Sequence, residues 1–275
     1  MIGSTGVDGE RAVWVKAVVT YDGTEYSGFQ RQANVTSIQE ELERSLEKLT
    51  GTFTRILAAG RTDAGVHAAG QVIACKPVWR HSLTDLHRGW NALLPEQIAI
   101  LNLEPAAQGF HPRFDARRRW YRYTIYRAPV RNPLVNRYSL HIARPLAVAT
   151  MQTAAQQLVG VHDFYAFGSP PQGENAVREV FRAGWKEDGC WLTFDIVANA
   201  FLYRMVRMVV GTLLRVGYGA LSSEDFGEIL RTQDRRRAGP AVAAKGLTLK
   251  AVTYEQNLAV NEFGGAVVDH SNDDR

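Results

Sequence analysis

The sequence has little cysteine, little lysine and no long apolar run, and each shortage excludes a class of protein. Two cysteines among 275 residues, Cys75 and Cys190, exclude a disulfide framework and any zinc-ribbon spacing. No uninterrupted apolar run approaches the ~18 residues that a membrane span needs, and residues 1–12 hold no apolar stretch behind a basic cap, so we expect no secretory signal. With 45% hydrophobic residues, the sequence predicts a globular, cytoplasmic enzyme or binding protein.

The basic residues are mostly arginine, and many of them gather in one stretch. Lysine and arginine number 32 and acidic residues 28, a net charge of +4. Between Phe110 and Arg144 there are nine arginines and a single acid, Asp115. Arginine pairs with phosphate through two parallel hydrogen bonds and stacks on bases, which lysine cannot do. A GC-rich genome would also raise the arginine content, but it would not cluster the arginines, so the cluster favours an anionic partner.

The hydrophobic patterns predict the order β-α-β-β-α-β twice. In the first half we expect a strand at 13–21, a helix from 38 that is capped by Thr36 or Ser37 and stopped by Gly51, strands at 52–58 and 70–76, a helix at 83–94 and a strand at 98–103. In the second half we expect a strand at 120–126, a helix at 148–158, strands at 177–186 and 191–198, a long helix at 201–218, a short helix from 223 and a strand at 247–254.

Two successive copies of this unit predict an α+β fold made of two ferredoxin-like (βαββαβ) halves. We expect the halves to join edge to edge into one mixed, mainly antiparallel sheet, with helices on one side and a basic cleft where they meet. The predicted domains are residues 1–108, which carry the loop described next, and residues 109–265, which carry the arginine-rich strand. Residues 266–275 are expected to form a disordered tail.

The densest set of chemical groups is the stretch from Gly60 to His67, which reads GRTDAGVH. Its glycines permit a tight turn and the close approach of a ligand, and the adjacent Arg61 would hold Asp63 ionised if the two side chains pair. An ionised carboxylate in a bare loop can serve as a nucleophile or a general base. The same composition also fits a β-turn in which Asp63 bonds its own backbone, and one Asp–His pair makes a poor metal site.

The stretch from Arg117 to Tyr123 (RRRWYRY) is typical of a nucleic-acid-binding strand. On a strand, alternate side chains share a face, so one face carries Arg118, Trp120 and Arg122 and the other carries Arg119, Tyr121 and Tyr123. Aromatic and guanidinium groups on one face can stack bases and neutralise phosphate. A solvated strand with half-buried aromatics would show the same alternation. However, the segment 110–144 holds nine arginines and one acid, and their positive charges repel one another unless an anionic partner neutralises them.

The helix predicted at 201–218 combines a wide apolar stripe with a line of arginines. Spacings of three, four and four residues place on one narrow face Arg204, Arg207, Gly211 and Arg215. Buried arginine is rare unless it is paired. This face therefore either lies at the surface or lines a cleft in which one arginine meets a carboxylate.

Five stretches of the sequence together resemble the tRNA pseudouridine synthase A family. They are Tyr21 to Gln32 (YDGTEYSGFQRQ), Gly60 to His67 (GRTDAGVH), Tyr121 to Tyr123 (YRY), Asn199 to Arg207 (NAFLYRMVR) and Gly246 with Leu247. They occur in the family's order, and the resemblance covers about residues 12–255. GRTDAGVH is highly specific and outweighs the β-turn interpretation of Asp63.

The resemblance implies a role for several residues. Asp63 matches the family's catalytic nucleophile, and Arg61 matches the arginine that handles the flipped nucleotide. Tyr121 matches the tyrosine that stacks on the target base, Arg207 the arginine that pairs with the catalytic carboxylate, and Leu247 an apolar residue of the pocket. Further RNA contacts are expected from side chains near the arginine-rich strand and at the start of the helix predicted at 201–218, namely Phe110, His111, Arg113, Phe114, Arg119 and Arg204.

The resemblance also implies the reaction and the partners. Family members convert uridine to pseudouridine at positions 38, 39 and 40 of the anticodon stem-loop of tRNA. They use no metal and no organic cofactor, and they act as homodimers that bind tRNA across both subunits. The same fold, two ferredoxin-like halves, is implied.

The sequence departs from the family at three places, and two other functions stay open. Phe29 replaces the usual tryptophan, Thr248 replaces a common tyrosine, and the loop 168–175 lacks a basic residue that many members carry, which places tRNA contacts from this loop in doubt. An RNA-binding module without activity would also explain the basic stretch and the aromatics. A metal-dependent hydrolase that uses Asp63 and His67 is a third hypothesis, although the sequence offers no further cluster of ligands.

Overall fold

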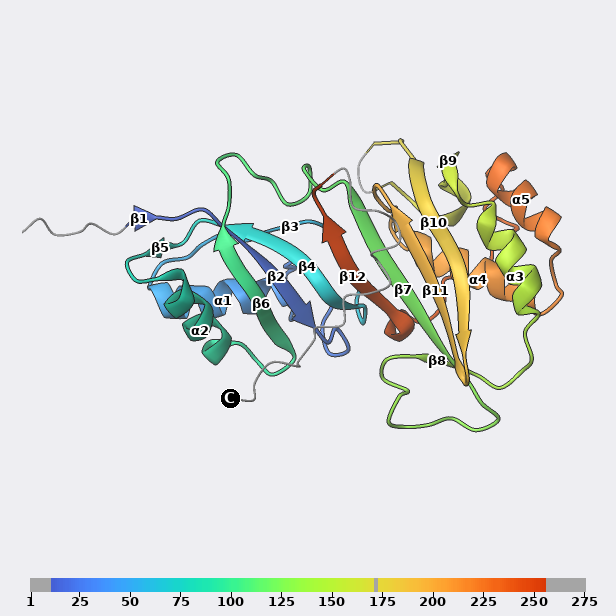
Figure 1. The fold of residues 1–275 in the computed structure, drawn as a ribbon, viewed down its shortest axis with the longest axis horizontal. Helices are drawn as coiled ribbons and strands as arrows, with labels where there is room; N and C mark the ends of the chain where they lie inside the picture. The colour runs from blue at the N-terminus through green and yellow to red at the C-terminus, as the bar shows by residue number, and fades with distance from the viewer. Residues whose placement is uncertain (1–10, 171–172, 256–275) are drawn as a thin grey trace, which may run out of the picture.

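One ten-stranded sheet runs through the computed structural model, which describes residues 11–170 and 173–255 (Figure 1). Along the sheet the strand order is β6-β2-β4-β12-β7-β11-β10-β9, and β3 and β8 pair with β4 and β7. Neighbouring strands are antiparallel except for β4 with β12 and β7 with β8. The predicted mixed, mainly antiparallel sheet is therefore confirmed.

The N-terminal half has the strand order of a ferredoxin-like unit. Its elements are β2 (Val15–Tyr21), α1 (Ile38–Thr50), β3 (Leu57–Ala58), β4 (His67–Cys75), α2 (Leu83–Leu93) and β6 (Ile98–Pro105). Two further short strands, β1 (Arg11–Ala12) and β5 (Val78–Trp79), form a separate sheet. In the large sheet the order β6-β2-β4-β3 places the first and third strands of the unit at the centre.

The C-terminal half repeats this order as β12-β7-β11-β10. Its elements are β7 (Arg118–Arg127), β8 (Leu140–Ile142), α3 (Val148–Gln156), β9 (Gly160–Asp163), β10 (Val177–Asp188), β11 (Trp191–Ala198), α4 (Met205–Gly217), α5 (Ser223–Thr232) and β12 (Leu247–Thr253), with short 3-10 turns at Tyr165–Phe167 and Ala244–Gly246. The predicted duplication is confirmed. The connection between the halves runs from residue 106 to 117, and the boundary predicted after residue 108 lies within it.

Helix α1 shows why the local predictions succeed. The side chain of Ser37 accepts a hydrogen bond from the backbone N–H of Glu40, which satisfies one of the free donors of the first turn. At the other end Gly51 adopts a left-handed conformation with φ of 74°, and its N–H donates to Glu47. The four-residue and three-residue spacing of apolar side chains in this helix predicts one buried stripe, of which Ile38, Leu42 and Leu46 are completely buried and Leu49 is partly buried.

The two halves meet along β4. One edge of this strand pairs with β3 of the same half and with β12 of the other half. Near its end β4 pairs with β3, through Ala74 with Leu57. Near its start it pairs with β12, through His67 with Thr248. Because β12 occupies the first residues of β4, β3 has only two residues instead of the strand predicted at 52–58. The chain between β3 and β4 leaves the sheet at the junction of the halves.

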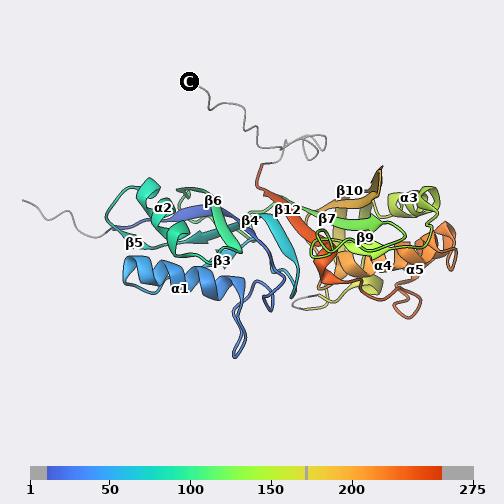
Figure 2. The same ribbon diagram turned by 90° about the horizontal axis from the view of Figure 1, so that it is seen from below.

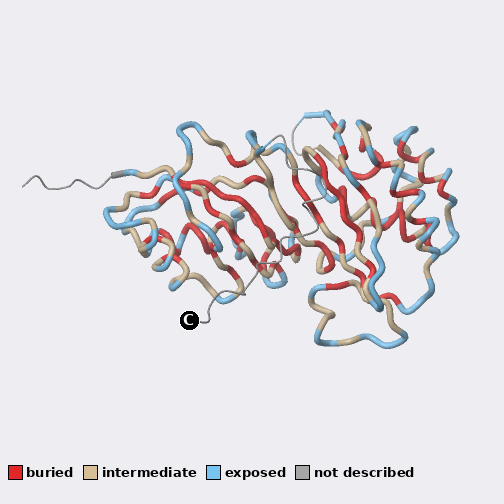
Figure 3. The backbone as a smooth tube through the Cα atoms, in the orientation of Figure 1, coloured by how far each residue is buried: buried red, intermediate tan, exposed pale blue. Residues whose placement is uncertain are grey.

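Helices α1 and α4 lie on the same side of the sheet, one under each half (Figures 1 and 2). Burial follows the strands and the helix faces turned toward them (Figure 3). One hydrophobic cluster extends through both halves, from Trp90 to Tyr123 and Phe226. In the described part of the chain no helix combines the length and the apolar character needed to cross a membrane. The predicted tail at 266–275 lies outside the described residues.

Candidate active site

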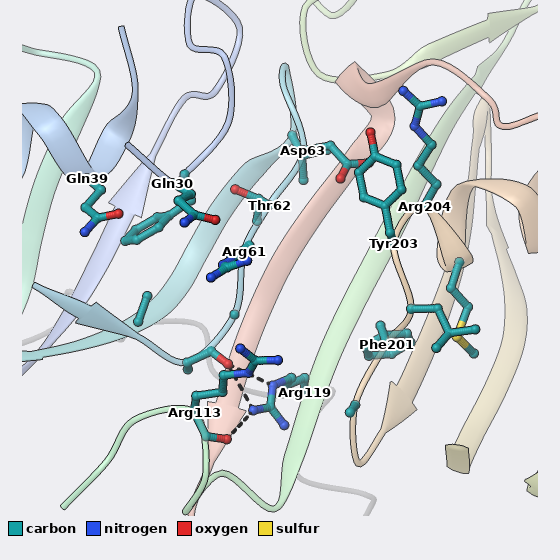
Figure 4. A pocket seen from close by; sticks show the side chains of 18 of the residues that line it. Gln30, Gln39, Arg61, Thr62, Asp63, Arg113, Arg119, Phe201, Tyr203 and Arg204 are labelled. Carbon is teal, nitrogen blue, oxygen red and sulfur yellow. Dashed lines mark hydrogen bonds between the residues drawn. The ribbon is translucent and has the colours of Figure 1, made fainter. Parts of the chain in front are cut away.

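A cleft of about 1110 Å³ opens where the halves meet, on the side of α1 and α4 (Figure 4). The N-terminal half lines it with side chains from the segments 27–39 and 55–66. The C-terminal half contributes side chains from the segments 111–121 and 200–207 and from Leu247. The cleft thus takes lining residues from all five stretches that carry the family resemblance, although no stretch lines it over its whole length.

The loop that carries Asp63 is held against the segment that follows β2. The backbone N–H of Phe29 donates to the carbonyl of Thr62 at 3.1 Å, and the Thr62 hydroxyl lies 2.8 Å from the Tyr21 hydroxyl. The N–H of Gly65 donates to the carbonyl of Tyr26 at 3.3 Å, and Gly65 adopts φ of 74°. These contacts fix the backbone on both sides of the carboxylate.

Two glycines of the underlying segment allow this close approach. Gly28 has φ of 97°, and a Cβ atom there would lie 2.7 Å from the carbonyl oxygen of Thr62. A Cβ atom on Gly23 would lie 2.0 Å from the carbonyl oxygen of Val66. Both obstacles are backbone atoms, so a side chain at either glycine would displace the Asp63 loop.

Asp63 forms an ion pair with Arg207 across the junction of the halves. Arg207 Nη1 lies 3.0 Å from Asp63 Oδ2, and the two side chains are 15% and 18% exposed. Arg207 Nε also donates to the carbonyl of Val242 at 2.7 Å, which fixes the plane of the guanidinium. Within the described residues, Oδ1 of Asp63 makes no hydrogen bond and is available to a substrate in the cleft.

The charge partner of Asp63 is therefore not its neighbour in sequence. Arg61 is exposed and lines the cleft, and it forms no ion pair with any described residue (Figure 4). Arg207 comes from a position 144 residues away. The expectation that one arginine of the helix face meets a carboxylate is fulfilled by Arg207.

The rest of this helix face is covered rather than solvated. Arg215 Nη1 donates to the carbonyl of Arg237 at 2.6 Å. A Cβ atom on Gly211 would lie 1.9 Å from the carbonyl oxygen of Pro240, so only glycine fits beside this segment. The segment 237–242 thus packs along α4 and carries the carbonyl that orients Arg207.

Helix α4 begins at Met205, four residues later than predicted, and Arg204 precedes it in a left-handed conformation with φ of 62°. A residue with a Cβ atom is strained there, whereas glycine is not. We expect Arg204→Gly to have a free energy of unfolding ~1 kcal/mol larger than Arg204→Ala, because both lose the same side chain and only alanine keeps the strain. Urea unfolding of the two variants measures the difference, and equal stabilities would contradict the assigned backbone strain.

Tyr121 forms one wall of the cleft. Its ring packs edge-to-face on Phe201, with ring centroids 5.0 Å apart and an interplanar angle of 85°. Burial raises the pKa of Tyr121, and the charges of Tyr21 and Asp63 raise it further, so the phenol stays neutral. Leu247 is buried beside it and also lines the cleft. Phe201, which the sequence predictions did not single out, fixes the orientation of the Tyr121 ring.

The residues expected to contact RNA divide into several groups. Phe114 is 74% exposed and packs on His111 at a centroid distance of 4.2 Å at the rim of the cleft. Arg113 and Arg204 line the cleft as well. Phe110 is not among the lining residues and instead packs against Tyr254, with centroids 5.0 Å apart. RNA contacts by these side chains stay predictions.

Consecutive arginines of the basic stretch have different surroundings. Arg117 is exposed. Arg118 lies over the ring of Phe181, 4.7 Å from its centroid, on the side of the sheet that carries Trp120. Arg119 is buried on the other side and reaches the cleft. The predicted alternation of faces is confirmed, but the side of Trp120 contains a structural ion pair, since Arg122 binds Asp195 at 2.9 Å.

Tyr203, which also escaped the sequence predictions, lies at the mouth of the cleft. It is 52% exposed, and the Arg204 guanidinium lies 4.9 Å from its ring centroid. Figure 4 shows both side chains next to Asp63. Its place within the stretch from Asn199 to Arg207 is the signal that could have identified it as a residue of the cleft.

His67 is held by contacts with the segment that follows β2. The residue is buried, its Nδ1 accepts a hydrogen bond from the backbone N–H of Gly23 at 3.1 Å, and the same atom lies 3.1 Å from Asp22 Oδ1. Burial lowers the pKa of His67, and the Asp22 carboxylate opposes this shift. Within residues 11–170 and 173–255, no three His, Cys, Asp or Glu side chains gather closely enough to hold a metal ion.

Comparison with known proteins agrees with this geometry. A family model described as tRNA pseudouridine synthase matches residues 17–115 and 154–255. The chain belongs to this family. A tRNA pseudouridine synthase A of Chloroflexus aurantiacus is 45% identical over 250 residues, which cover 89% of this chain and 90% of the relative. A tRNA pseudouridine synthase A of Moorella thermoacetica is 42% identical over 245 residues, covering 87% and 99%.

A third relative, the tRNA pseudouridine synthase A of Streptococcus thermophilus, is 41% identical over 244 residues, covering 87% of this chain and 98% of the relative. The residues matched by the family model include Asp63 and Arg207. Tyr121 lies in the segment 116–153, which the family model leaves out. As a member of the tRNA pseudouridine synthase family, the protein is an isomerase that forms pseudouridine in tRNA.

Proposed function

We propose that the protein isomerises uridine in the anticodon stem-loop of tRNA, at positions 38, 39 and 40, with Asp63 as the nucleophile. The observation that carries this proposal is the mostly buried ion pair of Asp63 with Arg207 in a cleft that both halves line. The pair fixes the direction of the carboxylate, and its second oxygen is available to a substrate in the cleft. The anticodon positions come from the family resemblance.

The reaction needs little more than a positioned carboxylate. Isomerisation breaks the bond between N1 of uracil and C1′ of the ribose, turns the base within the pocket and forms a bond from C5 to C1′. One proton leaves C5 and one is gained at N1, so nothing is oxidised and no group is lost. An ionised Asp63 can attack C1′, attack the uracil ring or take the proton from C2′, and each route uses the free oxygen of the carboxylate.

The target uridine must leave the RNA stem before it reaches Asp63. Unstacking and unpairing a base costs a few kcal/mol. The Tyr121 ring supports the proposal because it can offset part of this cost by stacking, worth ~1–3 kcal/mol per base. Phe201 and Leu247 add apolar surface to the cleft, against which a base could pack. At the mouth, Tyr203 and Phe114 offer exposed rings to neighbouring bases.

The RNA backbone would be held by Arg113, which lines the cleft, and by Arg117, which is exposed just before β7. Each phosphate contact adds ~0.7–0.9 to the slope of log affinity against log salt concentration. We therefore expect Arg113→Met and Arg117→Met each to lower this slope by about that amount. Arg118→Met is the matched control, because Arg118 lies on the opposite side of the sheet, over Phe181. Filter binding of tRNA at several salt concentrations gives the slopes. Equal changes in all three variants would refute the proposal that RNA phosphates bind on the side of Arg113 and Arg117.

The decisive test of the function is to map pseudouridine in an unmodified tRNA after incubation with the pure protein, without added metal or cofactor. We expect pseudouridine at one or more of positions 38, 39 and 40 and nowhere else. Binding without turnover would favour an RNA-binding module. Activity that disappears with a chelator would favour the metal-dependent alternative.

We also propose that the protein acts in the cytoplasm as a homodimer that binds tRNA across both subunits. Sedimentation at several protein concentrations tests the dimer.

A further inference from the structure

We propose that Arg119 and Arg137, both from the C-terminal half, are positioning residues that fix the two ends of the Asp63 loop. The proposal rests on the function proposed for Asp63, but it assigns these arginines a task that is separate from binding RNA. Arg207 holds the middle of the loop through the carboxylate itself. Three guanidinium groups of one half would thus hold a single loop of the other half.

Positioning is needed here because the halves are joined by few backbone hydrogen bonds at this point. Strands β4 and β12 are paired only through His67 with Thr248 and Ala68 with Leu249. Parallel pairing of this length is a weak joint. A small shift between the halves would move Asp63 relative to Arg207 and Tyr121, and a misplacement of ~1 Å can lower a rate by ~100-fold.

Arg119 holds the start of the loop. Its Nε and Nη2 atoms donate to the carbonyl of Ala59 at 3.2 and 2.9 Å, and Ala59 directly follows β3 (Figure 4). Nη2 also donates to the carbonyl of Arg113 at 2.8 Å, and Nη1 donates to the carbonyl of Asn199. The residue is 8% exposed. A guanidinium whose three nitrogens are all bound to carbonyls has little capacity left for a phosphate.

Arg137 holds the end of the loop through Asp22. Arg137 Nε lies 2.7 Å from Asp22 Oδ2, which also accepts a hydrogen bond from the Tyr138 hydroxyl at 2.9 Å. The next residue, Gly23, donates its backbone N–H to Nδ1 of His67 at 3.1 Å, and His67 is the residue at which the loop enters β4. The Tyr138 ring packs edge-to-face on the His67 ring, with centroids 5.1 Å apart.

The Asp22 carboxylate is suited to this link because it stays ionised. Its burial alone would raise its pKa, but hydrogen bonds from Thr24 and Tyr138 and the charge of His67 lower the pKa to about 2. Arg137 also binds Glu25 at 3.1 Å, so it spans two acids of the same segment. The ion pair of Asp22 with Arg137 therefore keeps both of its charges at neutral pH.

The first experiment separates positioning by Arg119 from contact with RNA. In Arg119→Lys the charge remains, but one ammonium cannot reach Ala59, Arg113 and Asn199 together. We expect kcat to fall by ~10–100-fold, with KM and the slope of log affinity against log salt unchanged. A slope that falls by ~0.7–0.9 with kcat unchanged would overturn the assignment and make Arg119 a phosphate ligand.

The second experiment uses Asp22→Asn, Arg137→Gln and the double variant. If the pair acts as one link, the losses in kcat are not additive, and the double variant is little worse than either single one. Arg88→Gln breaks a surface pair with Asp85 in the same half and is the control, expected to leave kcat unchanged. Additive losses, or equal losses in the control, would overturn the proposal.

Hydrogen exchange of the amides between Ala59 and His67 gives a readout that does not depend on catalysis. We expect exchange there to accelerate in Arg119→Lys and Arg137→Gln and to stay unchanged in Arg88→Gln, with the amides of α2 and β9 as internal references. Unchanged exchange in the loop would overturn the proposal even if activity fell. Accelerated exchange together with an active Asp63→Asn variant would refute only the function proposed for Asp63.

Discussion

Pseudouridine formation is expected to fall by ~10⁴-fold or more when Asp63 is replaced by asparagine, because no other carboxylate can take its place. Among the described residues, Asp63 is the only acidic side chain that lines the cleft. Asparagine has nearly the same shape and can still hydrogen-bond to Arg207, but it is neither a nucleophile nor a base at neutral pH. Single-turnover assays on unmodified tRNA with enzyme in excess measure the chemical step.

The same variant should still fold and bind tRNA. Its ion pair with Arg207 is replaced by a neutral hydrogen bond, so we expect a modest decrease of the free energy of unfolding, ~1–3 kcal/mol for a partly buried charge that loses its partner. Asp188→Asn changes an exposed carboxylate at the end of β10 in the same way and is the control, with full activity expected. Turnover by Asp63→Asn within ten-fold of the unsubstituted enzyme would remove Asp63 from the mechanism.

Local patterns were sufficient to predict the fold class. Periods of 3.6 and 2 residues distinguish helices such as α1 from strands such as β7, and caps such as Ser37 and Gly51 mark the ends. Repetition of the order β-α-β-β-α-β then predicted two ferredoxin-like halves, which the strand orders of the sheet confirm. Local patterns could not predict that β3 and β12 both pair with the same edge of β4. The length of the strand expected at 52–58 was therefore predicted wrongly, since β3 has only two residues.

The family resemblance predicted the pairing of Arg207 with Asp63, which the structure shows, whereas spacing and composition alone could not predict the contacts within the site. The position of Asp63 in a glycine-rich loop was visible in the sequence, whereas its partner Arg207 lies 144 residues away and depends on tertiary packing. Arg119 illustrates the same limit: composition marks it as one of three similar arginines, and only the carbonyl of Ala59, brought close by the junction of the halves, distinguishes it. The pairing of Asp22 with Arg137 bridges 115 residues and has no local signal.

Replacing Arg207 is expected to have the second largest effect, ~10²–10³-fold on the chemical step for Arg207→Met. The guanidinium performs two tasks at once, since Nε binds the carbonyl of Val242 while Nη1 binds Asp63. Methionine has a similar length but no charge, so the carboxylate of Asp63 would lose the partner that fixes its direction. The rate should therefore fall.

Arg207→Lys distinguishes charge from geometry. Lysine keeps the positive charge, but a single ammonium cannot bind Val242 and Asp63 in the two directions that the planar guanidinium uses. If orientation matters, Arg207→Lys has a rate between those of Arg207→Met and the unsubstituted enzyme, with tRNA affinity unchanged in both. Arg231→Lys, at an exposed position in α5, is the control. Full activity of Arg207→Lys would mean that only the charge is needed, and full activity of Arg207→Met would mean that the ion pair has no part in the reaction.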